Sequence, residues 1–287
     1  LSYDSYIYYY HYIKEMKIFK NNLNLKREIL KEKNLSFVPT MGSLHKGHEF
    51  LIKKAKKKRG KVIVSLFVNP KQFNSKNDFN NYPRNLHSDL NILKALKVNY
   101  IYIPNYKDIF SFKTKCNPYL DKINNILCGK FRKSHFKGVL NVVNRFLDIV
   151  KPRYLYLGKK DLQQLYLIAQ HIRKNKINTK IIECKTIREN NGVACSSRNK
   201  RLKQRELNIA SKVYKLILRK KKLLKKLKNL KLFIIELTKT IKSLGVTKIE
   251  YIEILNIKNL KKPQINKDKY NIFISYYLGK TRLIDNI

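Results

Sequence analysis

Short apolar segments alternate with amphipathic helical patterns between residues 35 and 184 of this 287-residue chain. Five segments have the length and apolar content of buried strands: 35–39, 61–68, 98–103, 153–157 and 180–184. Helical periodicity fills the intervals between them, at 46–59, 85–96, 139–150 and 162–174. This alternation predicts an α/β domain in which helices cover both faces of a parallel sheet. Ligands of such sheets bind at the carboxyl ends of the strands.

The pattern changes after Arg198. A long lysine-rich helical stretch, 206–244, is followed by strand-like segments at 248–255 and 272–277, which predicts a smaller α+β domain. Within it, residues 221–232 carry leucines at helical spacing. We interpret this block as the solvated face of a packed helix, and a helix that binds a membrane surface or nucleic acid is the alternative.

Residues 1–15 are rich in tyrosine and lack the basic flank and apolar core of a signal peptide. We expect translation to begin at Met16, so that 1–15 would be a non-native or disordered extension. A peptide ending at Glu15 in the native protein would contradict this expectation.

The chain is strongly basic, with a formal net charge of +45, and 43% of its residues are hydrophobic. The hydrophobic content indicates a globular protein. The charge has two explanations. The one we prefer is drift of the gene toward A and T, because A- and T-rich codons encode lysine, asparagine, isoleucine and tyrosine. The other is a functional basic surface that attracts polyanions. The four cysteines form no C-x-x-C pair, which favours a reduced, cytoplasmic protein. No apolar run is long enough to span a membrane.

The segment from Pro39 to His48 reads PTMGSLHKGH and joins a predicted strand to a predicted helix. A strand, a tight glycine turn and a helix together direct free backbone N–H groups toward an anion. His45 and His48 are three residues apart, so they share one face if the first turn is helical. Two imidazoles beside a helix N-terminus suit negative charge on phosphate oxygens, which indicates nucleotide chemistry. Two histidines that only cap the helix are the alternative.

This segment resembles the H-x-G-H signature of the nucleotidylyltransferase superfamily, and the longer string resembles the pantoate–β-alanine ligase family. Further blocks of that family follow in the same order: FVNPKQF (67–73), YPR (82–84), HFKGV (135–139), GKKDLQQ (158–164), SSRN (196–199) and LIDN (283–286). The resemblance covers residues 16–287. It implies a Rossmann-like domain that binds ATP and pantoate, which we place at 16–186, and a C-terminal α+β lid domain at 187–287.

The resemblance implies a reaction in two halves. ATP and pantoate give a bound pantoyl adenylate and pyrophosphate, and β-alanine then attacks the acyl carbon to give pantothenate and AMP. ATP is a substrate, Mg²⁺ is expected with it, and the metal ligands stay open. The family also implies a homodimer whose ligands are small molecules, with no specific nucleic acid and no membrane as partner.

The resemblance assigns catalysis to His45, His48, Lys160 and Arg198. It leaves open whether His48 transfers a proton or only donates a hydrogen bond. The residues expected to bind ATP come from three blocks of the chain. They are Met41, Gly42, Ser43, Leu44, His45, Lys46, Gly47, His48, Gly158, Lys159, Lys160, Asp161, Ile187, Cys195, Ser196, Ser197 and Arg198.

Gln72 and Gln164 are the residues expected to bind pantoate and β-alanine. A neutral amide donates and accepts hydrogen bonds at once, so it orients a carboxylate without trapping it in an ion pair. Asp89 is expected either near Mg²⁺ and the site or on an exposed helix surface. Lys159 and Cys195 depart from the residues that are common in the family.

Two other functions explain part of the sequence. A cytidylyl- or adenylyltransferase of the same superfamily would need cations for an acceptor phosphate, where this chain has Gln72 and Gln164. A basic nucleic-acid-binding protein would explain the charge but not the spaced histidine, glutamine and Ser-Ser-Arg blocks.

Overall fold

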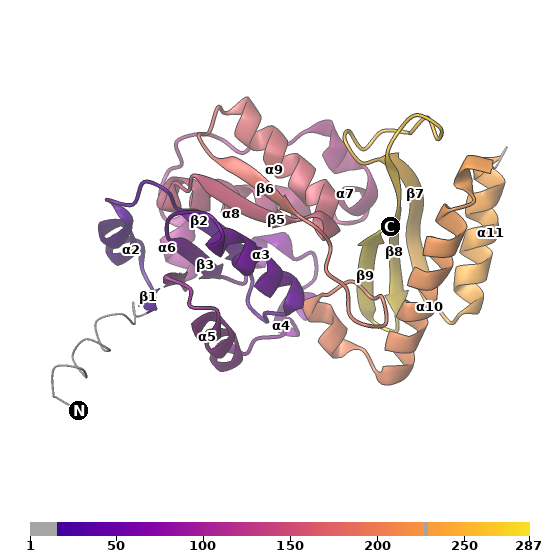
Figure 1. Ribbon diagram of the computed structural model, residues 1–287, viewed down its shortest axis with the longest axis horizontal. Helices are drawn as coiled ribbons and strands as arrows, with labels where there is room; N and C mark the ends of the chain where they lie inside the picture. Colours follow the sequence, from indigo (N-terminus) through magenta and orange to yellow (C-terminus); the bar gives the residue numbers. More distant parts are fainter. Residues whose placement is uncertain (1–15, 227–228) are drawn as a thin grey trace.

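The computed structural model contains two β-sheets, each with its own helices, and it describes residues 16–226 and 229–287 (Figure 1). The predictions for residues 1–15 therefore lie outside the described residues. No helix in the described part of the chain is long and apolar enough to cross a membrane.

The larger sheet is parallel and has six strands in the order β1-β4-β3-β2-β5-β6. The strands are β1 (Lys17–Phe19), β2 (Ser36–Thr40), β3 (Val62–Leu66), β4 (Tyr100–Tyr102), β5 (Tyr154–Gly158) and β6 (Lys180–Cys184). The five strands predicted from the sequence are confirmed. The sequence interpretation missed β1, a three-residue edge strand whose apolar signal is too short to detect.

Helices cover both faces of this sheet, and the strand residues alternate between them. Phe37 of β2 packs on one face of the sheet, and its neighbour Val38 packs on the other. Because both faces are buried, the central strands are mainly apolar, whereas the edge strands β1 and β6 contain Lys17, Lys180 and Glu183. The α/β prediction is confirmed, with a Rossmann-like parallel sheet as its core.

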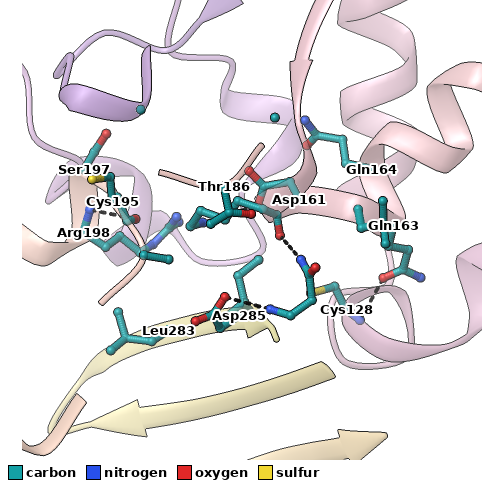
Figure 2. Close-up of a pocket in the computed structure, with 18 of the residues that line it drawn as sticks. Cys128, Asp161, Gln163, Gln164, Thr186, Cys195, Ser197, Arg198, Leu283 and Asp285 are labelled. Atoms are coloured by element: carbon teal, nitrogen blue, oxygen red, sulfur yellow. Dashed lines mark hydrogen bonds and ion pairs between the residues drawn. The ribbon is translucent and has the colours of Figure 1, made fainter. Parts of the chain in front are cut away.

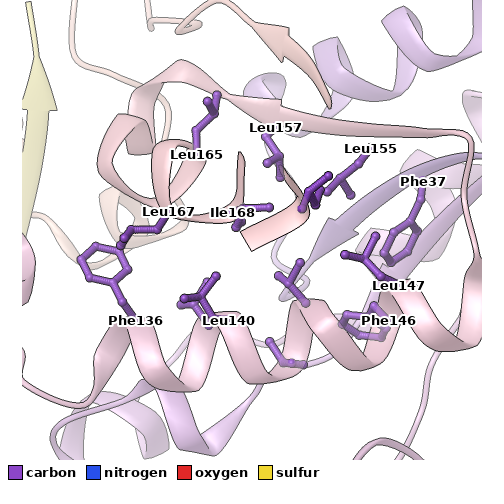
Figure 3. Close-up of a cluster of buried hydrophobic side chains, with 14 of the residues drawn as sticks. Phe37, Phe136, Leu140, Phe146, Leu147, Leu155, Leu157, Leu165, Leu167 and Ile168 are labelled. Carbon is purple, nitrogen blue, oxygen red and sulfur yellow. The ribbon is translucent and has the colours of Figure 1, made fainter. Parts of the chain in front are cut away.

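One face is covered by α2, α6, α8 and α9, and the other by α3 and α5. Figure 3 shows α8 side chains, among them Phe136, Leu140 and Phe146, facing Leu155 and Leu157 of β5. The helices are α2 (Asn22–Ile29), α3 (Lys46–Lys56), α4 (Lys76–Asn80), α5 (Leu86–Ala95), α6 (Tyr106–Phe110), α7 (Leu127–Phe131), α8 (His135–Val150) and α9 (Leu162–Lys174). Short 3₁₀ turns η1 (Pro70–Gln72), η2 (Lys122–Asn125) and η3 (Lys159–Asp161) connect them.

The C-terminal part packs two helices on an antiparallel three-stranded sheet, as Figure 1 shows. Its elements are η4 (Ser197–Arg201), α10 (Gln204–Lys221), η5 (Leu224–Lys226), α11 (Leu230–Ser243), β7 (Lys248–Asn256), β8 (Tyr270–Leu278) and β9 (Thr281–Asn286). The helical region predicted over 206–244 is confirmed as mainly helical but is divided in two, because α10 ends at Lys221 and α11 begins at Leu230. The leucines of 221–232 therefore do not form one helical face.

Strand β9 was not predicted, and its last residues contact the turn that follows β5 and the segment that follows β6. The side-chain amide of Asn286 donates hydrogen bonds to the backbone carbonyls of Lys159 and Lys160, at 2.9 and 2.8 Å. Asp285 accepts two hydrogen bonds from Arg188, at 2.6 and 3.0 Å. The LIDN block thus fixes the turn that follows β5.

Candidate active site

A cavity of about 330 Å³ lies at the carboxyl ends of the parallel strands and extends to the C-terminal sheet. Figure 2 shows Ser197 and Arg198 at one end, Asp161 in the middle and Gln164 at the other, with Leu283 and Asp285 of β9 beside them. Most residues predicted from the sequence line this cavity. They are Met41, His45, Gly47, His48, Gln72, Gly158, Lys160, Asp161, Gln164, Ile187, Cys195, Ser196, Ser197 and Arg198.

The glycine turn after β2 is held by Asp89, not left open for an anion. Both carboxylate oxygens of Asp89 accept backbone hydrogen bonds, from Ser43 at 2.8 Å and from Leu44 at 2.7 Å. Asp89 is 3% exposed, so its place on a helix surface is excluded. Gly42 has φ +74°, and a Cβ there would lie 2.9 Å from Asp89 Oδ2. The expectation of free N–H groups in this turn is therefore wrong at Ser43 and Leu44.

His45 is the N-cap of α3, and its conformation fixes its tautomer. Nδ1 accepts a hydrogen bond from the backbone N–H of Gly47 at 3.1 Å, so Nδ1 carries no proton. Burial, followed by the electrostatic effect of His48 and of the Lys160 cation, lowers the pKa of His45 to about 2. The imidazole is therefore neutral and carries its proton on Nε2. His45 therefore caps the helix and also lines the cavity, so capping does not exclude a role there.

His48 lies in the first turn of α3, and its ring stacks on that of His45 with centroids 4.0 Å apart. The prediction that the two histidines share one face is confirmed. Burial lowers the pKa of His48 to about 4, although the Asp161 carboxylate opposes the shift. Nδ1 of His48 is buried and has no hydrogen-bond partner among the described residues. A neutral imidazole with an unused polar atom suits a ligand that brings its own partner.

Lys160 supplies a cation at the start of α9. Its Nζ lies 3.5 Å from Asp161 Oδ1, and its side chain is 19% exposed. Lys159, the neighbouring residue, points elsewhere and pairs with Glu183 at 2.9 Å. The turn η3 therefore directs one of two consecutive lysines into the cavity.

Arg198 reaches the cavity from η4, and its charge is already paired. Nη2 of Arg198 lies 2.8 Å from Asp78 Oδ2, and Arg201 Nη1 lies 2.9 Å from the other oxygen of Asp78. Ser196 caps η4 by accepting the Arg198 N–H, and Ser197 Oγ donates to the Ser43 carbonyl at 3.0 Å. The Ser-Ser-Arg block thus connects the two parts of the chain across the cavity.

Gln72 and Gln164 both line the cavity, and Figure 2 shows Gln164 at the opposite end from Arg198. The Gln72 amide donates to Met41 Sδ at 2.6 Å and accepts from Asn69 Nδ2 at 3.3 Å. The adjacent Gln163 differs from Gln164, because its amide donates to the carbonyls of Ile123 and Ile126 at 2.8 Å. Gln163 therefore uses its amide group within the fold. The Gln164 amide makes no such hydrogen bond among the described residues and is available to a ligand in the cavity.

Five residues expected to bind ATP do not line the cavity: Gly42, Ser43, Leu44, Lys46 and Lys159. Ser43 and Leu44 are buried in the turn that Asp89 holds, and Lys46 is exposed near Glu189. Other polar residues to which the sequence interpretation gave no role also line the cavity, among them the charged or titratable Asp78, Arg132, His135 and Arg282. Of these four residues, only His135 belongs to one of the family blocks identified in the sequence. The other three could have been found only from their closeness to such a block along the chain.

No group of three or more His, Cys, Asp and Glu side chains suited to a metal occurs among residues 16–226 and 229–287. Asp89 does not line the cavity, and its two oxygens accept the Ser43 and Leu44 N–H groups, so its carboxylate supports the turn. All four cysteines are free thiols. Burial, followed by the hydrogen bond to Glu189, raises the pKa of Cys195 to about 11, so this thiol is not a thiolate at neutral pH.

A model of the family described as pantoate–beta-alanine ligase matches residues 11–287. The chain belongs to the pantoate–beta-alanine ligase family. It is 44% identical over 265 residues to the pantothenate synthetase of Francisella tularensis subsp. novicida, with 92% of each chain covered. It is therefore an enzyme, a ligase, and the family decides against the nucleic-acid-binding and phosphate-acceptor alternatives.

Solved structures of the pantoate–beta-alanine ligase family have the same fold. The crystal structure of the Francisella tularensis enzyme, complexed with beta-gamma ATP and beta-alanine, has a TM-score of 0.81 at 43% identity, covering 95% of this chain and 97% of that one. The pantothenate synthetase of Thermus thermophilus has a TM-score of 0.86 at 27% identity, covering 95% of this chain and 99% of that one.

Proposed function

We propose that this protein condenses pantoate with β-alanine to give pantothenate, with ATP converted to AMP and pyrophosphate. In the first half, a pantoate carboxylate oxygen forms a bond to the α-phosphorus of ATP while the bond to pyrophosphate breaks. In the second half, the β-alanine amine forms a bond to the acyl carbon, AMP leaves, and the nitrogen loses a proton. The observation that carries this proposal is the convergence of His45, Lys160, Gln72 and Gln164 on one cavity.

The stacked histidines are proposed to stabilise charge on the leaving pyrophosphate. Because Nδ1 of His45 accepts the Gly47 N–H, the Nε2–H is the group left for a phosphate oxygen. Because burial lowers the pKa of His48 to about 4, we assign it hydrogen-bond donation, not transfer of a proton from an imidazolium. Neutral donors fixed in place before the reaction need no reorganisation as charge develops.

Lys160 and Arg198 are proposed to hold the triphosphate. Lys160 acts as a point charge, whereas the Arg198 guanidinium can contact two oxygens at once. Arg198 must exchange its contact with Asp78 for the phosphates. Asp161, at the centre of the cavity in Figure 2, is proposed to accept hydrogen bonds from the ribose hydroxyls.

Gln72 and Gln164 are proposed to orient pantoate. Their amides donate to the carboxylate and accept from the hydroxyls without forming an ion pair, so the attacking oxygen keeps its nucleophilicity. Such a reaction depends on positioning and charge stabilisation and needs no protein nucleophile.

Further features of the family are kept as proposals. Mg²⁺ is proposed to enter as part of the MgATP substrate, held by phosphate oxygens and water, which is how this ion is commonly bound. Residues 187–287 are proposed to act as a lid, since η4 and β9 both border the cavity. A homodimer and a cytoplasmic location are also proposed, the latter supported by the four free thiols.

The direct test is release of AMP from ATP, pantoate and β-alanine, with each omitted in turn. We expect pyrophosphate release to require ATP and pantoate. We expect AMP release to require ATP, pantoate and β-alanine together. Transfer of the nucleotide to a phosphorylated acceptor instead of pantoate would contradict the proposal.

A further inference from the structure

Three arginine side chains border the cavity, and one of them has no carboxylate partner. Arg198 pairs with Asp78 at 2.8 Å, and Arg282 pairs with Glu250 at 2.6 Å. Arg132 makes no ion pair with any residue in the described part of the chain. The cavity therefore contains one guanidinium whose charge is not neutralised.

Arg132 is held in place by neutral groups. Its Nη2 donates to the backbone carbonyl of Gln72 at 3.1 Å, and its Nη1 contacts His135 Nε2 at 3.0 Å. His135 Nδ1 lies 2.8 Å from the same carbonyl. Because a carbonyl only accepts, Nδ1 carries the proton and Nε2 accepts from Arg132. This arrangement fixes the plane of the guanidinium beside Gln72.

The surroundings of Arg132 favour an anion. Burial and the charges of Arg198 and Arg282 lower the pKa of Arg132 to about 10, so it remains charged at neutral pH. A guanidinium has five N–H groups, and two are used on Gln72 and His135. A partly buried charge without a counterion is unfavourable, and a bidentate carboxylate would stabilise it.

The chemistry of the reaction selects which anion. The triphosphate is proposed to lie near Lys160 and Arg198, and the pantoate carboxylate becomes an acyl phosphate, so neither needs a permanent cation beside Gln72. The β-alanine carboxylate keeps its charge through both half-reactions. It is separated from the amine by two carbons, so its cation must lie close to the residues that hold the acyl group. Arg132 contacts one of these, Gln72, directly.

We propose that Arg132 binds the carboxylate of β-alanine and so selects an amine that carries a carboxylate at this distance. This inference rests on the proposed function. His135 positions the guanidinium, and Gln72 connects the β-alanine site to the pantoate site through its backbone carbonyl.

The test separates the two half-reactions and compares two amines. Pantoate-dependent exchange of pyrophosphate into ATP reports the first half. Attack on the adenylate by β-alanine or by its neutral amide, β-alaninamide, reports the second. For Arg132→Gln, kcat/KM for β-alanine is expected to fall about 30- to 100-fold, the worth of a charge-assisted bidentate contact. For β-alaninamide and for pyrophosphate exchange, the change is expected to stay below about threefold.

Arg145→Gln is the matched control. Arg145 also donates to backbone carbonyls, those of Ile109 and Phe112 at 3.1 and 2.6 Å, but it does not line the cavity. Both half-reactions should be unchanged in it. Arg132→Lys retains the positive charge but lacks the paired N–H donors of a guanidinium. Its kcat/KM for β-alanine should therefore fall less than that of Arg132→Gln, and it should still prefer β-alanine over β-alaninamide.

Equal losses for β-alanine and β-alaninamide in the Arg132 variants would overturn the inference, because they would indicate that Arg132 only supports Gln72. If pyrophosphate exchange in the unaltered protein did not require pantoate, the proposed function would fail, and the inference with it.

Discussion

Asp78 joins two arginines that lie about 120 residues further along the chain. Its carboxylate is 2.8 Å from Arg198 Nη2 and 2.9 Å from Arg201 Nη1. Burial alone would raise the pKa of Asp78, but the two guanidiniums hold it below its ordinary value. Asp78 and a bound triphosphate would therefore compete for Arg198.

Removing that competition should strengthen ATP binding. In Asp78→Asn, Arg198 is free before ATP arrives, and a negative charge near the phosphates is lost. A partly exposed ion pair is worth about 1 kcal/mol or less, so we expect KM for ATP to fall about three- to fivefold. KM for ATP is measured from the rate of pantoate-dependent pyrophosphate exchange. Asp108→Asn, on α6 and away from the cavity, should leave KM unchanged. A higher KM for ATP in Asp78→Asn would show that Asp78 positions Arg198 and does not compete for it.

His45 has two functions that substitution can separate. In His45→Asn, the side chain still caps α3, because Asn is among the best N-cap residues, but the Nε2–H is lost. Adenylate formation should fall about 10²- to 10³-fold with little change in thermal stability. His45→Ala should show the same kinetic loss and also lose about 1 kcal/mol of stability. Normal adenylate formation in His45→Asn would reduce this residue to a capping role.

The arrangement of the site was predictable to different degrees. The strands and the H-x-G-H helix were recognisable because their signals are local: apolar runs, a glycine turn and helical spacing. The roles of Asp89, Asp78 and Asn286 were not, because each acts through a contact with residues 46 to 127 positions away. Which of Lys159 and Lys160 faces the cavity is likewise set by the turn η3 and not by residue type.

The pH profile of kcat/KM for ATP should lack an imidazole titration near 6.5. This parameter reports ionisations of the free enzyme. Burial lowers the pKa of His45 to about 2 and that of His48 to about 4, so both are neutral throughout the range from pH 5.5 to 8. A limb near pH 6.5 in the parent that disappears in His48→Asn would contradict the assignment of a neutral His48.

Gly138 allows α8 to approach η1 closely. A Cβ at this position would lie 2.2 Å from the Lys71 carbonyl oxygen and 2.8 Å from the Gln72 nitrogen. Gly138→Ala must therefore displace η1, and we expect a loss of about 1–3 kcal/mol of stability together with a raised KM for pantoate. Thermal unfolding and pyrophosphate exchange measure the two effects. Lys137→Ala, at the exposed neighbouring position, should affect neither. An unchanged KM for pantoate in Gly138→Ala would separate η1 from the pantoate site.

Stability should decline on the acid side because buried histidines resist protonation. Burial, followed by the charge of Arg132, lowers the pKa of His135 well below 6.5, and burial also lowers that of His171. In the unfolded chain both take up a proton near pH 6.5, so below this pH the unfolded state binds more protons than the folded state. Their contribution to stability is therefore complete above about pH 7 and is lost as the pH falls.

Each such histidine should lower the free energy of unfolding by about 1.4 kcal/mol per pH unit, until its folded-state pKa is reached. Urea unfolding between pH 7.5 and pH 5 measures this slope. His135→Gln should reduce this slope by the contribution of one histidine, because the variant has one titrating group fewer. A free energy of unfolding that does not change between pH 7 and pH 5 would show that these imidazoles take up protons in the folded state as readily as in the unfolded chain.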